Sequence, residues 1–493
     1  DDDDDDDDVL SSDAYFSYSY GGTRRPNFMF ILLDDVGAND GGWSVAGSNH
    51  SWMPHTTPNL DSLASRGVRL TSYYTAWLCG PTRSAFLTGR YPVRLGFQTT
   101  PDVFEASLPL EERLLPQELS RYGYTSYLVG KWHLGFESWA YTPTYRGFDS
   151  FYGYYSGSVG FWNKLTGLNS SAANSSSAWF DLQWFEGREG GLVSDEDEAG
   201  PGSHLTDVLQ QKVEAYLAAH AEVVDASGDD GEEAPFFFYY AAENVHVGAD
   251  YGFEVPEVWL RQCQFQDRES PHGGFVSGQQ RAYCGLMLQI DDAIGRTVCA
   301  LDHFGFGDNT VVVVSSDNGG WKNMTGNNYP YRGSKGSLLQ GGVRNFCFLM
   351  GPEWLIPSSR HNATYGGLVH VTDWFPSFMR LASQGNWSGT PRNGFALDGV
   401  NVLDAIAQNA SSPRTEVFHN FDAARRKAAV QMGSVKMVFG RVGKVRPPPV
   451  LFETNETAAV AQGPLPLGNC SALAAEFDQE DDEEDDDDGR GGG

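Results

Sequence analysis

One short stretch combines a cysteine with the features that would activate it as a nucleophile. Residues 79–90 have the sequence CGPTRSAFLTGR, in which a Gly-Pro turn precedes a run that favours a helix. A cysteine at a helix N-terminus lies beside free backbone N–H groups and the positive end of the helix dipole, and Arg83 and Arg90 add two positive charges. Such surroundings stabilise an anion, so Cys79 is predicted to be a reactive thiolate rather than a buried structural cysteine.

Two apolar runs, residues 27–33 and 309–316, each end in side chains that can bind a hard cation. These side chains are Asp34 and Asp35 after the first run and Asp317 and Asn318 after the second. Carboxylates at the end of a buried strand are unfavourable unless a cation pairs with them, and calcium prefers carboxylate and amide oxygens, which magnesium also accepts. The pattern predicts one divalent metal site, with a plain polar turn after each strand as the alternative.

Two lysines and two histidines could act on an anion bound near these groups. Lys131 and His133 follow an apolar stretch, and their spacing of two would put both on the same side of an extended chain. His246 follows the apolar run 235–242, at what we expect to be the same edge of the sheet. Lys335 lies in a glycine-rich loop, where a lysine is ordinarily a surface residue.

Together these motifs resemble the type I sulfatases, the formylglycine-dependent sulfatase family. The shared features are C-x-P-x-R followed by L-T-G-R in residues 79–90, Asp-Asp after the first apolar run, G-K-W-H-L-G at 130–135, D-N-G-G at 317–320 and H-V-T-D-W at 370–374. The resemblance extends from about residue 26 to about residue 436 and is nearest to the arylsulfatase B (N-acetylgalactosamine-4-sulfatase) group. It weakens beyond that point, where a short second domain ends in an acidic tail.

The resemblance implies a catalytic apparatus. In this family the cysteine of the motif, here Cys79, is oxidised by a formylglycine-generating enzyme to formylglycine (3-oxoalanine), whose hydrate attacks sulfur. One Ca²⁺ per chain would be bound by Asp34, Asp35, the modified Cys79, Asp317 and Asn318. The implied catalytic residues are Arg83, Lys131 and Lys335 for the charge on the sulfuryl group, His246 with Lys335 for protonating the leaving oxygen, and His133 for assistance at the formylglycine.

The implied function is hydrolysis of a sulfate monoester, either an aryl sulfate or a sulfated sugar, with sulfated polysaccharide among the candidate partners. Two other functions remain open. A phosphodiesterase or phosphonate hydrolase could share the fold, because phosphoryl and sulfuryl groups have similar size and geometry. A non-catalytic calcium-binding secreted protein could instead use the acidic ends of the chain.

The apolar pattern predicts the elements that must position these residues. The runs 27–33, 235–242 and 309–316 favour strands buried on both faces, as in a parallel sheet, and residues 204–220 and 283–301 repeat apolar side chains at helical spacing. The resemblance adds the alkaline-phosphatase-like α/β fold. In that fold a large mixed sheet is flanked by helices, and a smaller C-terminal α+β domain contains an antiparallel sheet.

The remaining stretches divide the chain into domains. Residues 147–163, rich in glycine and aromatic residues, are predicted to form a loop that lines a pocket, and residues 186–203 and 225–234 are predicted to be acidic loops. The predicted organisation is a disordered acidic segment at 1–25, a catalytic domain at 26–400, a small domain at 401–470 and a disordered acidic tail at 471–493.

Charge and hydropathy exclude two kinds of partner. The chain has 493 residues and a formal net charge of −31. Without the acidic runs at 1–8 and 476–488 and without Arg490, 46 acids face 33 bases and the net charge is −13. This moderately acidic body argues against binding of nucleic acid or an anionic membrane. The chain contains no run of about 18 apolar residues, so no membrane span is predicted.

Nine N-x-S/T sequons favour passage through the secretory pathway, to a lysosomal or extracellular destination. No signal peptide is visible, and the sequence begins without methionine, which leaves room for an upstream segment. The chain has six cysteines, and conversion of Cys79 would leave five, so at least one of these is expected outside intramolecular disulfides.

Overall fold

The computed structural model describes most of the chain between residues 24 and 440. The described residues are 24–43, 53, 56–99, 107–167, 178–193, 202–226, 234–264, 278–440, 459–460, 470, 474 and 477. The predicted acidic segment at 1–25 lies outside them except for its last two residues, as do five sequon asparagines: Asn49, Asn169, Asn174, Asn455 and Asn469.

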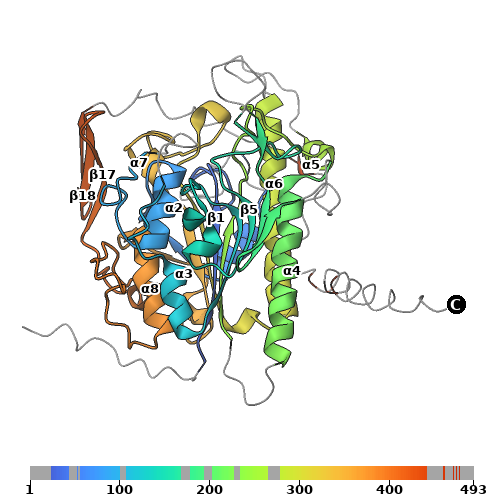
Figure 1. Ribbon diagram of the computed structural model, residues 1–493. Coiled ribbons are helices and arrows are strands. Elements are labelled where there is room, and N and C mark those ends of the chain that lie inside the picture. The colour runs from blue at the N-terminus through green and yellow to red at the C-terminus, as the bar shows by residue number, and fades with distance from the viewer. Residues whose placement is uncertain are drawn as a thin grey trace, which may run out of the picture.

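A ten-stranded mixed sheet, in the order β15-β2-β14-β12-β1-β10-β4-β5-β8-β9, forms the centre of the molecule (Figure 1). Its five central strands are parallel: β12 (Thr310–Ser316), β1 (Asn27–Leu33), β10 (Phe236–Ala241), β4 (Thr125–Lys131) and β5 (Ser150–Tyr154). The outer strands are β15 (Ala363–Tyr365), β2 (Val68–Leu70), β14 (Cys347–Met350), β8 (Gln183–Glu186) and β9 (Glu189–Leu192). The three predicted apolar runs are thus adjacent strands, and their carboxyl ends meet at one edge.

Strand β1 is completely buried because both of its faces are covered by helices. Phe28, Phe30 and Leu32 pack on one side, and the alternate residues Met29, Ile31 and Leu33 pack on the other. One side carries α2 (Cys79–Thr88), α3 (Leu115–Leu119), α8 (Trp374–Ala382) and α9 (Leu403–Gln408). The other carries α1 (Pro58–Ser65), α4 (Leu205–Ala226) and α6 (Gly278–His303). In Figure 1, α2, α3 and α8 lie left of the sheet and α4 lies right of it. The predicted α/β fold class is confirmed.

A small antiparallel sheet follows the large one. It consists of β17 (Glu416–Asp422), β18 (Lys427–Met432) and β19 (Val435–Gly440). Val417 and Ala429 from its inner face pack against Tyr74 and Trp77 of the large part. The predicted domain boundary at residue 400 stays a prediction. Beyond this residue, α9 still packs in the core of the large part.

Two predicted loops contain strands. The glycine-rich stretch 147–163 includes β5, which pairs with β4 inside the sheet, and the acidic stretch 186–203 includes β9 at its edge. Gly153 of β5 explains the first error: a Cβ atom there would lie 1.9 Å from the carbonyl oxygen of Gly130, so the close approach of two strands requires glycine.

The cysteines form two disulfides, Cys263–Cys284 and Cys299–Cys470. Cys79 and Cys347 lie outside them, which agrees with the prediction that at least one further cysteine stays out of a disulfide. The prediction of a disordered acidic tail from residue 471 is wrong at Phe477. This residue is 7% exposed, and its ring packs against Phe304. No helix among the described residues is long and apolar enough to cross a membrane.

Candidate active site

Cys79 is the first residue of α2, directly after the extended residue Leu78, as the sequence predicts. It is 4% exposed, and burial raises the pKa of its thiol even though Lys131 and Lys335 act in the opposite direction. Desolvation therefore acts against the predicted thiolate and outweighs the nearby positive charges.

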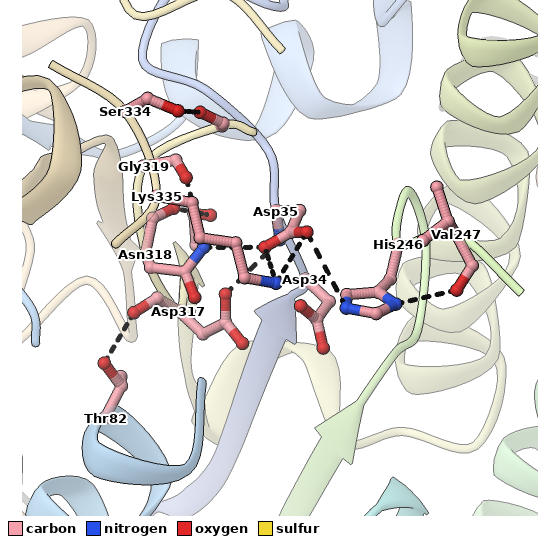
Figure 2. A network of polar contacts seen from close by, with 12 residues as sticks. Asp34, Asp35, Thr82, His246, Val247, Asp317, Asn318, Gly319, Ser334 and Lys335 are labelled. Atoms are coloured by element: carbon pink, nitrogen blue, oxygen red, sulfur yellow. Dashed lines mark hydrogen bonds and ion pairs between the residues drawn. The ribbon is translucent and has the colours of Figure 1, made fainter. Parts of the chain in front are cut away.

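The oxygen donors predicted at the ends of β1 and β12 converge, because these strands are parallel neighbours with Leu33 opposite Ser316 (Figure 2). Asp35 accepts a hydrogen bond of 2.7 Å from Asn318 Nδ2, and its backbone N–H donates to Asp317 Oδ1 at 3.3 Å. All four residues are at most 3% exposed: Asp34, Asp35, Asp317 and Asn318. The structure thus brings the predicted cation ligands together in the interior.

Two buried cations contact the carboxylates of this cluster. Arg83 Nη2 lies 3.1 Å from Asp34 Oδ2 and 3.3 Å from Asp317 Oδ2, and Lys131 Nζ lies 2.5 Å from Asp34 Oδ2. Burial alone would raise the pKa of Asp34, but Lys131, His246 and Arg83 hold it well below its usual range. Burial and the Asp34 carboxylate raise the pKa of Asp317 to about 7. The neighbouring cations therefore offset the negative charge of Asp317 less than that of Asp34.

Two oxygen atoms of the cluster have no hydrogen-bond partner although they are buried: Asp34 Oδ1 and Asn318 Oδ1. A buried polar atom left unpaired costs about 1–3 kcal/mol, so a group that satisfies both oxygens would stabilise the fold. Ligand atoms of Asp34, Cys79 and Asp317 lie within 4.8 Å of one another. This set of hard oxygens fits a calcium ion, with residue 79 close enough to contribute.

Lys335 and His246 lie at the more open side of the cluster, each with a side chain 12% exposed. Lys335 Nζ is 2.6 Å from Asp35 Oδ1, and His246 Nε2 is 3.7 Å from Asp35 Oδ2. The other ring nitrogen, Nδ1, is hydrogen-bonded to the carbonyl oxygen of Val247 at 2.8 Å (Figure 2). Burial and the charge of Lys335 lower the pKa of His246 to about 4. A bound anion would therefore meet Lys335 and His246 first.

His133 lies in the same region, but its backbone lacks the extended conformation on which the predicted orientation of Lys131 and His133 depends. Its φ of 56° is left-handed, so residues 131–133 are not an extended chain and the two-residue spacing does not determine which way the ring faces. The ring is 9% exposed, its Nδ1 has no partner, and a Cβ atom on Gly157 would lie 2.7 Å from its Nε2. Burial, followed by Lys131, keeps the pKa of His133 well below its ordinary value.

Two residues of this region were not predicted from the sequence. Thr82 Oγ1 donates to the carbonyl oxygen of Asp317 at 2.5 Å and accepts from the N–H of Ala76, so it joins α2 to the end of β12. Glu243, two residues after β10, is buried, and this burial raises the pKa of its carboxyl to about 8. Its place after a buried strand is the same signal that identified Asp34 and Asp317.

The family model described as Sulfatase matches residues 26–384, most of the described chain. The chain belongs to the sulfatase family. Members typically use a metal ion and a formylglycine, and this sulfatase has its buried acidic cluster beside Cys79. It is 32% identical to arylsulfatase J of Mus musculus over 83% of its length, but it spans only 60% of that relative. It is 30% identical to arylsulfatase A of Homo sapiens, covering 84% of this chain and 75% of the relative.

Solved structures share its fold. Ps i-CgsB, solved in complex with k-i-k-neocarrahexaose, superposes with a TM-score of 0.66 at 22% identity and covers 93% of this chain and 92% of its own. The PsFucS1 sulfatase from Pseudoalteromonas sp. gives a TM-score of 0.64 at 26% identity, and the match covers 84% of this chain and 78% of its own. The narrower resemblance to the arylsulfatase B group stays a prediction.

Proposed function

We propose that this protein hydrolyses sulfate monoesters to an alcohol and inorganic sulfate. The observation that supports this most directly is a buried carboxylate cluster with two unpartnered oxygens beside Cys79. Formylglycine made from Cys79 would supply the attacking oxygen, and one Ca²⁺ held by Asp34, Asp35, Asp317, Asn318 and the modified residue 79 would draw charge from the sulfuryl oxygens. The raised pKa of the unmodified thiol agrees with a need for this conversion.

We assign different tasks to the cations. Lys131 and Arg83 contact Asp34 in the interior, so they hold the carboxylates in place and limit their mutual repulsion. Lys335 is the more exposed lysine, and we assign it to binding a sulfuryl oxygen as negative charge develops. Direct contact of Arg83 and Lys131 with the transferring group remains a prediction from the resemblance. We assign His133, with its unpartnered Nδ1, to the formylglycine hydroxyl.

We assign protonation of the leaving oxygen to His246, assisted by Lys335. His246 Nδ1 is occupied by the carbonyl oxygen of Val247, so Nε2 is the atom available to substrate. The low pKa of His246 is caused first by burial and next by the charge of Lys335. A bound sulfate ester brings a negative charge that opposes the effect of Lys335 and favours the protonated ring.

Replacing His246 by alanine should slow the hydrolysis of sugar sulfates far more than that of nitrophenyl sulfate. An alkoxide needs a proton in order to leave, whereas nitrophenolate leaves unaided, so we expect a loss of about 10²-fold or more for the sugar and under about tenfold for the aryl ester. The measurement is kcat/KM on both substrates, with the exposed His361→Ala as control. Equal losses would restrict His246 to sulfate binding.

The proposed function itself is tested on protein produced together with a formylglycine-generating enzyme. The Cys79 peptide should be about 18 Da lighter than the cysteine form, and each chain should hold one calcium ion. Chelation should remove nitrophenyl sulfate hydrolysis and calcium should restore it. Full activity with an unmodified thiol, or without metal, would contradict the proposal. Magnesium in place of calcium would correct the identity of the ion, and faster cleavage of nitrophenyl phosphate would favour a phosphoesterase.

For the natural substrate we propose a sulfated sugar or polysaccharide. N-acetylgalactosamine-6-sulfatase of Homo sapiens, whose name gives a sulfated sugar, is 28% identical over 82% of this chain and 70% of its own length. For the location we propose the secretory pathway, with a lysosomal or extracellular destination. Two disulfides support an oxidising compartment, and the described sequon asparagines are all exposed: Asn323, Asn362, Asn386 and Asn409.

A further inference from the structure

The loop that follows His246 presents an exposed aromatic ring in a backbone conformation that disfavours it. Residues 242–256 connect β10 to α5 (Glu257–Gln262), and Tyr251 in this loop is 53% exposed with a φ of 63°. This left-handed region suits glycine or asparagine, whereas a bulky aromatic residue is uncommon there. The loop imposes it: the N–H of Tyr251 donates to the carbonyl oxygen of Gly248, and that of Gly248 donates to the carbonyl oxygen of Gly252.

The loop is also anchored beyond this turn. Glu254 accepts a hydrogen bond of 3.0 Å from the N–H of Trp162, and its carbonyl oxygen is hydrogen-bonded to His204 Nε2 at 3.2 Å. Tyr251 is therefore displayed on a fixed turn. An exposed ring held in a disfavoured conformation on a fixed turn points to a use outside the fold itself.

A second aromatic residue connects Tyr251 to the candidate active site. Trp321 follows the glycines after β12, and its ring centroid lies 6.2 Å from that of Tyr251 in an edge-to-face arrangement. Lys335 Nζ lies 5.6 Å from the centroid of the same Trp321 ring. Since Lys335 also contacts Asp35, the residues run outward in the order Asp35, Lys335, Trp321, Tyr251.

We propose that Trp321 and Tyr251 form an aromatic platform that binds the saccharide rings of a sulfated oligosaccharide. This inference rests on the proposed function, because it takes Lys335 as the group that binds sulfate. With the sulfate at Lys335, the sugar that bears it would lie against Trp321, and the neighbouring sugar would reach Tyr251. The C–H faces of sugar rings stack on aromatic rings, whose rigid side chains give large contact area at low entropic cost.

The surroundings favour a sugar over an apolar leaving group. Tyr251 is open to solvent rather than set in an apolar cleft, and its neighbour Asp250 is exposed. Lys335 adds a positive charge next to the Trp321 ring. A steroid or lipid sulfate would need an enclosed apolar surface, whereas a sugar presents hydroxyls to such polar side chains and an apolar face to the rings.

The test compares two substitutions of Tyr251. Tyr251→Asn removes the ring but suits the left-handed turn, so its thermal midpoint should equal or exceed that of the wild type. Tyr251→Phe keeps the ring and should bind as the wild type does. Kinetics are measured on nitrophenyl sulfate and on a sulfated monosaccharide and tetrasaccharide from the same polymer, chondroitin sulfate or carrageenan. Trp139→Ala, which removes an equally exposed ring elsewhere, is the control.

We expect Tyr251→Asn to raise KM about tenfold for the tetrasaccharide, with kcat little changed and with the monosaccharide and nitrophenyl sulfate unaffected. The same substitution in a Cys79→Ala background, which cannot turn over, should weaken tetrasaccharide binding by a similar factor in calorimetry. An unchanged KM and dissociation constant for Tyr251→Asn would overturn the platform, as would a wild type that cleaves nitrophenyl sulfate but neither binds nor cleaves any of these saccharides. Absence of all sulfatase activity would instead contradict the proposed function, while the binding measurement would still test the platform.

Discussion

Cys79→Ser should abolish sulfate-ester hydrolysis, with a loss of kcat of at least about 10⁴-fold, while leaving the fold intact. Serine has nearly the same shape at the first position of α2, so the packing of this buried site should hold. A serine hydroxyl cannot be converted by the proposed route into an aldehyde hydrate, and a serine sulfate ester would lack the second hydroxyl that expels sulfate. Steady-state turnover of nitrophenyl sulfate measures the loss of kcat, and a thermal unfolding curve checks that the fold is intact.

Cys347→Ser provides the matched control, because Cys347 is the other buried cysteine outside the disulfides of the described chain. It is the first residue of β14 and lies opposite Ser315 of β12, but it is not among the residues assigned to the site, so the loss of its thiol should lower stability at most modestly without changing kcat. Substantial turnover by Cys79→Ser would show that the nucleophile is not made from Cys79.

Asp34→Ala should produce the second large effect, because it removes activity and stability together. Asp34 pairs with both Lys131 and Arg83 in a fully buried setting, and a buried cation that loses its partner costs about 3–5 kcal/mol. It also offers one of the two unpartnered oxygens, so calcium content should fall with it. We expect kcat to drop about 10³-fold or more. Denaturant unfolding measures the loss of stability, and elemental analysis measures the loss of calcium.

A second buried ion pair separates the two effects. Asp373 is paired with Arg414, which links the segment before the small sheet to α8, far along the chain from the cluster. Asp373→Ala should therefore lower stability by a comparable amount, yet the folded protein should retain its calcium. If Asp34→Ala keeps its metal and its turnover, the assignment of the metal site is wrong.

The site could be predicted largely because parallel strands place their carboxyl ends together. An apolar run followed by Asp34 predicts a strand and a polar end without any knowledge of the neighbours, and the same logic holds for Asp317. The sequence could not show that Arg83 faces inward to the carboxylates, because that depends on how α2 crosses the sheet. Nor could it show the left-handed conformation of His133.

Composition misled where tertiary contacts decide the structure. The stretch that contains β5 has the glycine content of a loop, but Gly153 is required by the carbonyl oxygen of Gly130 on the neighbouring strand. Cys79 misled in another way, since the helix end and the nearby lysines suggest a thiolate while burial outweighs them. Burial is a property of the complete fold, and a local motif does not contain it.

Under the proposed conversion of Cys79 to formylglycine, the burial of this residue limits the time available for its modification. A modifying enzyme can bind residue 79 only while the chain around it is still unfolded. The residue becomes buried when β12 pairs with β1. Asp317 is synthesised 238 residues after Cys79, since 317 minus 79 is 238. At about 5–20 residues per second this leaves roughly 12–48 s during synthesis. The yield of active protein should thus depend on the rate of modification relative to the rate of translation. Slower elongation should therefore raise the active fraction.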